Sequence, residues 1–145
     1  MEQDKFEEYL NNRYQKEIKY YDDQACRNKL YYYGFSFLSI ILSSITSVFL
    51  YLIDIYLSIP FRIYAFITST IVSLTLALIS LFNFHEKWMN YRTTCESLKK
   101  ELHYYNAKLG DYSISTDPEA LFIERVEEQL SKEHTRWLRV IKAKE

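Results

Sequence analysis

The sequence predicts an all-α membrane protein, in which a two-helix transmembrane hairpin has long helices extending into a three-helix cytoplasmic bundle. The first observation is a gap in charge, because Asp54 and Arg62 are the only charged residues between Leu30 and Phe84. The second is the scarcity of helix-breaking residues, since the 145 residues include only two glycines and two prolines. The third is a regular apolar repeat after the second apolar run, which is typical of a packed helix.

The composition of the whole chain conceals the two apolar runs. Mean hydropathy is -0.25, a value typical of a soluble protein, because very polar arms dilute the apolar segments. The formal net charge is -1, so no basic surface indicates a nucleic-acid partner. The length fits one structural unit.

Residues 1–29 are predicted to form an N-terminal cytoplasmic amphipathic helix. Charges occur throughout this segment, and no small-residue cleavage site follows a short apolar core, so it is not a signal peptide. Gly34 is the sole residue near the junction that disfavours a helix, so we expect this helix to run into the first span. Its apolar or aromatic side is formed by Phe6, Leu10, Tyr14, Ile18, Tyr21 and Ala25.

Residues 30–53 and 63–84 are predicted to be transmembrane helices 1 and 2. Each uncharged run exceeds the roughly 20 residues that a helix needs to cross the hydrocarbon core. The extracytoplasmic loop between them, residues 54–62, is too short to fold by itself. A buried core hairpin in a soluble bundle is the competing interpretation, and two such long uncharged runs disfavour it.

Positive charge predicts that both termini are cytoplasmic. The outer loop holds one cation, Arg62, whereas the flanking arms hold Lys16, Lys19, Arg27 and Lys29 before the first span and Lys87, Arg92, Lys99 and Lys100 after the second. The aromatic residues agree with this orientation, because such side chains favour membrane interfaces. Those expected at the cytoplasmic interface are Tyr31, Tyr32, Tyr33 and Trp88, and those at the far interface are Tyr51, Tyr56 and Tyr64.

Residues 85–109 are predicted to form a cytoplasmic heptad helix that continues transmembrane helix 2 without a break. Intervals of three and four alternate along this segment, which is the pattern of a coiled-coil packing seam. We expect the helix to end at Gly110, a residue suited to a left-handed C-cap. The seam consists of Trp88, Tyr91, Cys95, Leu98, Leu102, Tyr105 and Leu109.

A turn at residues 110–117 is expected to lead into a C-terminal cytoplasmic helix at residues 118–142. Asp117, Pro118 and Glu119 have the order of an N-cap, a proline at the first helical position and an acid in the first turn. Glu133 falls within the apolar side of this helix and would need a cationic partner if it were buried. That side consists of Phe122, Val126, Leu130, Trp137 and Ile141.

Small hydroxyl residues recur on one side of each span, and two interpretations remain open. Small residues allow helices to approach closely in lipid, so they would pack the hairpin or a homo-oligomer. Alternatively, they would line a water-filled path in an oligomer of several chains, gated by a hydrophobic constriction. The candidate residues are Ser36, Ser39, Ser43 and Ser47 in the first span and Ser69, Ser73 and Ser80, with Ala65 and Ala77, in the second.

The residues that usually carry catalysis or bind metals form no recognisable set. The three histidines, His85, His103 and His134, have no partners at metal-ligand spacing, so no metal or cofactor is expected. Cys26 and Cys95 are expected to be small buried thiols, with a disulfide or redox switch as the alternative. Because no nucleophile, base and glycine motif occur together, the chain is not expected to be an enzyme.

Two segments flanking the spans resemble the SLATT family. Before the first span lies Tyr20-Tyr21-Asp22-Asp23-Gln24-Ala25, which is similar to an aromatic-Asp-x-x-Ala stretch, although Tyr20 stands where the family pattern has tryptophan. After the second lies the run from Trp88 to Lys100, similar to Trp-x-x-Tyr-Arg-x-x-x-Glu-x-Leu-Lys. Gly110-Asp111-Tyr112 resembles a Gly-x-Tyr turn, and the last helix also matches, at 122–127 and 133–137, so the resemblance covers roughly 6–141.

The resemblance implies an oligomeric two-transmembrane effector in the bacterial inner (cytoplasmic) membrane that forms a pore during an antiphage or conflict response. It further implies a trigger, which is a cyclic nucleotide or a separately encoded nucleotide synthase or sensor. Candidate signal-binding residues are Arg27, Arg92, Lys99 and Lys100, although Arg92 has the alternative of a salt bridge to Glu96, Asp22 or Asp23. The second hypothesis is a non-conducting, membrane-tethered scaffold that recruits a cytoplasmic partner.

Overall fold

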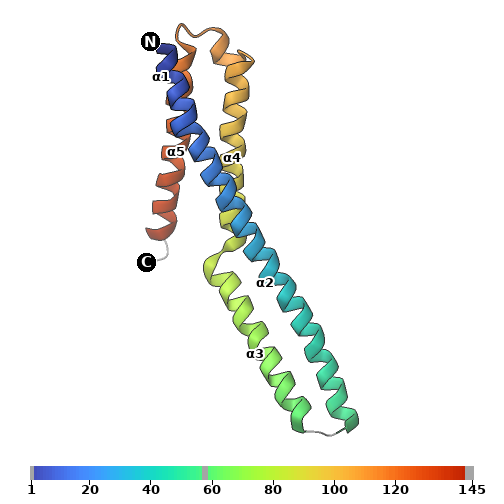
Figure 1. The fold of residues 1–145 in the computed structure, drawn as a ribbon. Helices are drawn as coiled ribbons and strands as arrows, with labels where there is room; N and C mark the ends of the chain where they lie inside the picture. Colours follow the sequence, from blue (N-terminus) through green and yellow to red (C-terminus); the bar gives the residue numbers. More distant parts are fainter. Residues whose placement is uncertain (1, 57–58, 143–145) are drawn as a thin grey trace. The chain divides into compact units, whose positions relative to one another are not determined.

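The computed structural model describes residues 2–56 and 59–142, with side chains at positions 4–53, 55 and 59–132. Every element in this part of the chain is helical, which confirms the all-α prediction (Figure 1). Residues 1–25 and 89–145 form one compact unit, the bundle, and residues 26–88 form a second, the hairpin. The elements in order are α1 (Glu2–Tyr9), η1 (Leu10–Tyr14), α2 (Gln15–Tyr56), α3 (Ile59–Phe82), α4 (Phe84–Asn106), η2 (Gly110–Ser113) and α5 (Pro118–Lys142).

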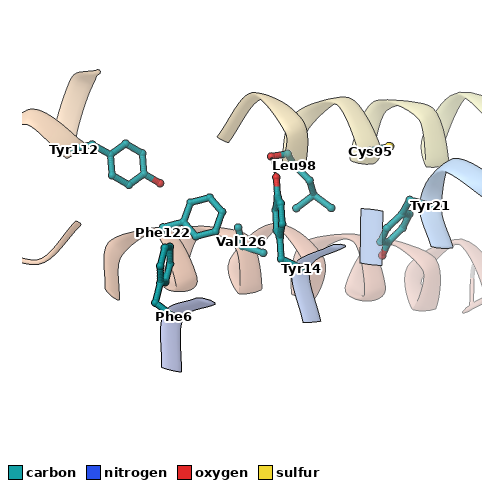
Figure 2. Close-up of a cluster of buried hydrophobic side chains, with 8 residues drawn as sticks. All are labelled: Phe6, Tyr14, Tyr21, Cys95, Leu98, Tyr112, Phe122 and Val126. Atoms are coloured by element: carbon teal, nitrogen blue, oxygen red, sulfur yellow. Dashed lines mark hydrogen bonds between the residues drawn. The ribbon is translucent and has the colours of Figure 1, made fainter. Parts of the chain in front are cut away.

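The bundle is held together by an aromatic core to which all of its helical segments contribute (Figure 2). Phe122 of α5 is completely buried, and its ring centroid lies 5.8 Å from that of Phe6 and 5.3 Å from that of Tyr14. Tyr14 is almost fully buried, and its hydroxyl donates a 2.7 Å hydrogen bond to the carbonyl of Leu98 on α4. The buried core residues are Phe6, Tyr14, Tyr21, Cys95, Leu98, Tyr112, Phe122 and Val126.

The N-terminal arm contains a π-helical turn, η1, which the sequence pattern had not predicted. Phe6, Leu10, Tyr14 and Ile18 follow one another at intervals of four. On an α-helix each such interval overshoots a full turn by about 40°, so the series would drift around the helix. A π turn has a hydrogen bond between residues five apart, whereas an α-helix has one between residues four apart. The π turn therefore contains one more residue and corrects this drift. All four side chains therefore pack on the bundle core.

The connection before α5 differs in part from the expected turn. Helix α4 ends at Asn106, four residues before Gly110, and the backbone is left-handed at both Lys108 (φ 50°) and Gly110 (φ 62°). Leu109, expected on the packing seam, lies beyond the helix and is about half exposed. Asp117 caps α5 as expected, because its Oδ1 accepts a 3.0 Å hydrogen bond from the Ala120 amide. The side chains of Glu133, Trp137 and Ile141 lie outside the described residues.

The hairpin pairs the second part of α2 with α3 along an inner line of buried and half-buried side chains (Figure 1). Intervals of four and three alternate along this line, which is the packing geometry of a left-handed coiled coil. Ser36 and Leu52 are half-buried at its edge. The line consists of Asn28, Tyr32, Phe35, Ser39, Leu42, Thr46, Phe49 and Ile53 in α2 and Phe61, Ala65, Thr68, Val72, Thr75 and Ile79 in α3.

Both helices of the hairpin extend further into the loop than the expected spans, although α3 ends at Phe82, two residues before the expected end. Helix α2 continues to Tyr56 and α3 begins at Ile59, so the loop is shorter than residues 54–62. Pro60 fits within the first turn of α3, where its missing amide hydrogen would have no helical partner. The side chain of Asp54, expected near Arg62, lies outside the described residues.

The helix expected to run unbroken from residue 63 to residue 109 is two helices that meet at Asn83. The Asn83 backbone is left-handed (φ 47°), a conformation that asparagine tolerates better than most residues. After Ile79, the inner line would continue at Phe82, but the next half-buried aromatic is Phe84. This shift of two residues equals about 200° around an α-helix. The break at Asn83 therefore changes which side of the helix faces inward.

Candidate functional site

At the centre of the inner line, hydroxyl and small side chains make the contact between the two helices of the hairpin. Thr46 and Thr68 form a hydrogen bond between the helices, with 2.7 Å between their Oγ1 atoms. Ser39, Ala65 and Thr75 are buried along the same line. Threonine and serine at heptad positions let two apolar helices approach closely and satisfy their own hydroxyls. The inner contact of the hairpin is thereby complete.

Most of the predicted serines lie away from this inner line. Ser39 is buried and Ser36 is half-buried, whereas the other five candidates are exposed. The exposed serine stripes are defined as Ser43 and Ser47 on α2 and Ser69, Ser73 and Ser80 on α3. Each of these serines directly follows a residue of the inner line, so its side chain is rotated by about 100° around the helix from that line. The stripes therefore lie on the flanks of the hairpin.

Three of the five hydroxyls in the serine stripes donate hydrogen bonds into their own helices. The Ser73 hydroxyl donates to the Ser69 carbonyl at 3.0 Å, and the Ser69 hydroxyl donates to the Phe66 carbonyl at 2.9 Å. The Ser47 hydroxyl donates to the Ser43 carbonyl at 3.2 Å. Such back-bonding is a common way for a hydroxyl to be satisfied within a helix. The oxygen lone pairs remain on the outer side, where they can accept hydrogen bonds from water or bind a cation weakly.

Between its two ends, most of the remaining surface of the hairpin is apolar. The described residues include two helices long and apolar enough to cross a membrane. In the most apolar 18-residue segment of each helix, only 6% and 11% of the segment is buried. The core helix of a soluble protein would be mostly buried, so the soluble-core alternative is further disfavoured. Large exposed side chains on this surface include Phe37, Ile40, Val48, Leu50, Ile63, Phe66, Ile67, Leu74, Leu76 and Leu81.

Of the four cations that the sequence suggested for signal binding, two share a carboxylate and two lie apart. Arg92 pairs with Glu96 at 2.8 Å and with Asp22 at 3.6 Å, and Lys99 lies 3.8 Å from the same Asp22 carboxylate. The Lys100 ammonium lies 5.2 Å from the centre of the Tyr104 ring. Arg27 is exposed and belongs to the hairpin unit, whereas the other three belong to the bundle. Asp22 thus brings Arg92 and Lys99 together.

A second polar cluster in the bundle centres on Glu101, which the sequence analysis did not single out. Its side chain is 11% exposed, and its carboxylate accepts a 2.6 Å hydrogen bond from Tyr112 and pairs with Arg125 at 3.3 Å. Gln129 Nε2 lies 3.4 Å from the second carboxylate oxygen. Arg125 also pairs with Asp111 and lies over the Tyr112 ring. This cluster fixes η2 against α4 and α5.

The pKa of the Tyr112 phenol is raised, first by burial and then by its hydrogen bond to Glu101. A raised pKa keeps the phenol protonated, so it remains a donor to the carboxylate. Tyr112 is the tyrosine of the Gly-x-Tyr turn, which is the one signal in the sequence that pointed to this cluster.

A third polar cluster ties the N-terminal arm to α5. Arg13 binds Glu127 through two hydrogen bonds of 3.0 and 3.1 Å, and the Tyr9 hydroxyl donates to the same carboxylate at 3.0 Å. The hydrogen bond from Arg13 holds the pKa of Glu127 below its ordinary value. The π turn places Tyr9 and Arg13 on the same side of the arm, so both reach one carboxylate.

The two cysteines lie in different units and differ in burial. Cys95 is fully buried, and its Sγ lies 3.8 Å from the Ile18 carbonyl and from Asp22 Oδ1. Burial raises the pKa of the Cys95 thiol, which favours its protonated form. Cys26 is exposed, contrary to the expectation that both thiols are buried. No group of histidine, cysteine and acidic side chains among the described residues has the arrangement of a metal site.

The predicted packing seam of α4 is divided between buried and partly buried residues. Cys95 and Leu98 are fully buried in the bundle core, and Tyr91, Leu102 and Tyr105 pack against it. Trp88 belongs to the hairpin unit, where its ring lies 5.8 Å from that of Tyr33.

Comparison with known proteins places the chain in a family. Residues 16–120 match the family described as "Protein of unknown function (DUF4231)", and this segment is well over half of the chain. It includes both helices of the hairpin, the whole of α4 and the start of α5. The description does not carry the SLATT name. No curated protein and no solved structure matches the chain. The chain therefore belongs to the DUF4231 family.

Proposed function

We propose that the hairpin spans the bacterial inner membrane and that several copies assemble into a pore, with both termini in the cytoplasm. Two long helices with an almost continuous apolar exterior support the membrane placement, because water would not stabilise that surface. The excess of Lys and Arg in the two arms over the single Arg62 of the loop supports the orientation.

The position of the serine stripes carries the proposal of a pore. Since other residues complete the inner line, these hydroxyls are not needed to hold one hairpin together. In lipid they would gain little from their outward oxygens, whereas in an assembly they would line a hydrated path. A single hairpin encloses no lumen, so the proposed pore requires several chains. The large aliphatic side chains between the stripes would form the hydrophobic constriction that gates it.

The proposed trigger is a nucleotide signal or a partner protein acting on the bundle. The resemblance to the SLATT family supports this role in a bacterial conflict response. Arg92 and Lys99 share the Asp22 carboxylate, and a nucleotide phosphate would compete with that carboxylate for both cations. Binding would thus replace an internal ion pair, which provides a route from signal to conformational change.

The test is ion or dye flux from liposomes that contain the purified chain, measured with and without a panel of cyclic nucleotides. Leucine at Ser43 and Ser73 should abolish flux, because it removes hydroxyls from the stripes and adds bulk. The matched control is leucine at Ser44 and Thr70, two exposed hydroxyl residues about 200° from the inner line. The control should conduct as the unmodified chain does.

Each other outcome of the flux measurement changes the proposal in a defined way. Equal flux from the two double variants would remove the serine stripes from the pore. No flux from protein shown to be inserted and folded would contradict the pore and favour the scaffold that recruits a cytoplasmic partner. In that case, mutations on the exposed surface of the bundle, rather than in the hairpin, should change the phenotype.

A further inference from the structure

One end of the hairpin carries cations and aromatic rings in a repeated order along α2. Arg27 and Lys29 are exposed on either side of the inward-facing Asn28. One helical turn further along, Tyr31 and Tyr33 are exposed in the same way. Because residues four apart lie on the same side of a helix, each cation has a tyrosine one turn from it towards the apolar region.

The start of α4 completes this end of the hairpin. The Lys29 ammonium lies 5.7 Å from the centre of the Trp88 ring, and the Tyr33 ring lies 5.8 Å from that ring. The ring centroids of Tyr31 and Phe84 are 5.6 Å apart. Lys87, next to Trp88, adds a third cation. The collar is defined here as Arg27, Lys29, Tyr31, Tyr33, Lys87 and Trp88.

The charges of the collar have no anionic partner in the described chain. Arg27, Lys29 and Lys87 form no ion pair with any residue whose side chain the structure describes. Glu86 is the one acidic residue in segments 26–33 and 82–88. The other end of the hairpin has a single cation, Arg62. Three cations against one acid leave an excess of positive charge at the collar end, and the other end has no such excess.

We propose that the collar binds the headgroups of anionic phospholipids. The cations would contact lipid phosphates, while Tyr31, Tyr33 and Trp88 would lie at the level of the glycerol backbone. This inference rests on the proposed membrane placement of the hairpin. It adds a lipid preference that the placement does not require, since an apolar hairpin would enter a neutral bilayer equally well.

The spacing of the collar fits the dimensions of a bilayer interface. Four residues of α-helix rise about 6 Å, which separates each cation from its tyrosine along the helix. The headgroup region on one side of a bilayer is about 5–8 Å thick, taken as half the difference between the total thickness and the hydrocarbon core. A cation at the phosphate level thus places the tyrosine at the hydrocarbon boundary, where aromatic side chains are most stable.

A lipid fits these features better than a soluble anion does. The cations are distributed on both sides of α2 and on α4, whereas a small anion would need them to converge on one point. The exposed tyrosines would also gain nothing from a dissolved phosphate. A layer of anionic headgroups around the hairpin uses the cations and the rings together.

The experiment measures which lipids contact Trp88. The full chain, with Trp137 replaced by phenylalanine, is reconstituted in bilayers of brominated phosphatidylcholine, and its tryptophan fluorescence is quenched by the bromine. Unbrominated phosphatidylglycerol is then added in increasing proportion. Recovery of fluorescence gives the relative affinity for the anionic lipid, which should be several-fold above that for phosphatidylcholine, with an upper bound of about fivefold for each cation.

The variants compare two sets of three charges. Arg27→Gln, Lys29→Gln and Lys87→Gln together should reduce the preference to about one. The matched control replaces Lys5, Lys16 and Lys108 by glutamine, since these are exposed lysines of the bundle that also form no described ion pair. The control should keep the preference. If the collar variant does not fold, salt provides the second test on the unmodified collar, because about 1 M NaCl should abolish a preference that is strong at about 0.1 M.

Three results on lipid preference would overturn the inference while leaving the membrane placement intact. They are an absence of preference in the unmodified collar, a preference that the collar variant keeps, and an equal loss in the lysine control. Millimolar inorganic phosphate that competes with the lipid would also contradict it, because that result indicates a soluble-anion site. Failure of brominated phosphatidylcholine to quench Trp88 at all would instead contradict the membrane placement itself.

Discussion

The bundle and the hairpin are both helical, but they differ in which side chains they bury and which they expose. In the bundle, aromatic residues are buried at the centre and the partly exposed polar residues are paired with one another, as in the Arg13–Glu127 contact. In the hairpin, a narrow inner line is packed between the helices, and most large side chains outside it are apolar and exposed. The bundle therefore has the organisation of a self-sufficient core, whereas the hairpin needs an apolar surrounding or further copies of itself.

The largest effect is expected from matched phenylalanine substitutions in the two units. Phe122→Ala removes a ring with 0% exposure that packs on three other rings, so the bundle should lose about 3–5 kcal/mol of its unfolding free energy. Phe66→Ala removes a ring that is 72% exposed, and its effect in detergent should be within about 0.5 kcal/mol. Denaturant titration monitored by tyrosine fluorescence measures both. Equal losses would mean that the hairpin helices have an interior that the burial pattern does not reveal.

Single-residue deletions should separate the π turn from regular helix. Deleting Asn12 changes the spacing of the arm from intervals of four to alternating fours and threes, so an ordinary α-helix can keep Phe6 and Tyr14 on the core. The cost should be below about 1 kcal/mol. Deleting the exposed Lys19 moves Phe6 and Tyr14 out of phase with Tyr21 around the helix. The cost should be at least about 2–3 kcal/mol, the lower part of the range for truncating a core aliphatic side chain. If thermal unfolding shows the Asn12 deletion to be the more damaging, the spacing explanation of η1 is wrong.

Acid should weaken the bundle partly through Glu127. The ordinary pKa is 4.5, and the Arg13 contact lowers it in the folded state. A lowered folded-state pKa contributes stability that is fully present above pH 4.5 and is lost as the pH falls through the lower folded value. Arg13→Gln should therefore make the midpoint of urea unfolding less dependent on pH below about 5. Lys132→Gln, which removes an exposed pair with Glu128, is the control and should change this dependence less.

The smallest effect is expected at the hydrogen bond between the hairpin helices. Replacing Thr46 and Thr68 by valine in a double-mutant cycle should give a coupling of about 0.6 kcal/mol, typical of a polar contact between helices in lipid. Thr70, which bonds only within its own helix, provides the control when paired with Thr46. Steric trapping or a similar association assay in bilayers measures the coupling. A coupling near zero would show that shape, rather than this hydrogen bond, holds the inner line.

The sequence predicted the inward-facing residues of the bundle better than those of the hairpin. The reason is that polar and apolar residues alternate in the bundle but not in the hairpin. In the bundle, charged residues alternate with apolar ones, so Cys95 and Leu98 were recognisable as seam positions, and Asp117 was recognisable as a cap. In the hairpin, both sides of each helix are apolar or small, so periodicity did not distinguish the inner Thr46 and Thr68 from the exposed serine stripes. The spans themselves were predictable, because length and lack of charge do not depend on which side faces inward.

Local backbone changes were the other features that the pattern did not predict. Asn83 gave no signal, because neither a proline nor a glycine marks the break, and the two heptad series on either side each look regular alone. The π turn was hidden in the same way, since intervals of four are compatible with a helix over any short window. Both features become visible only when the phase of the apolar series is followed over several turns.

The bundle is assembled from two pieces of chain that the hairpin separates, which sets an order of events during synthesis. Phe6 and Tyr14 leave the ribosome early, yet their partner Phe122 follows more than 100 residues later. At ordinary rates of translation this delay is roughly 5–20 s. The whole hairpin is therefore synthesised before the bundle can close, and the N-terminal arm waits during that time without its native core. A mutation that slows translation of the hairpin segment would thus lengthen the time that the N-terminal arm spends without its core partners. This would happen even though no contact of the folded bundle had changed.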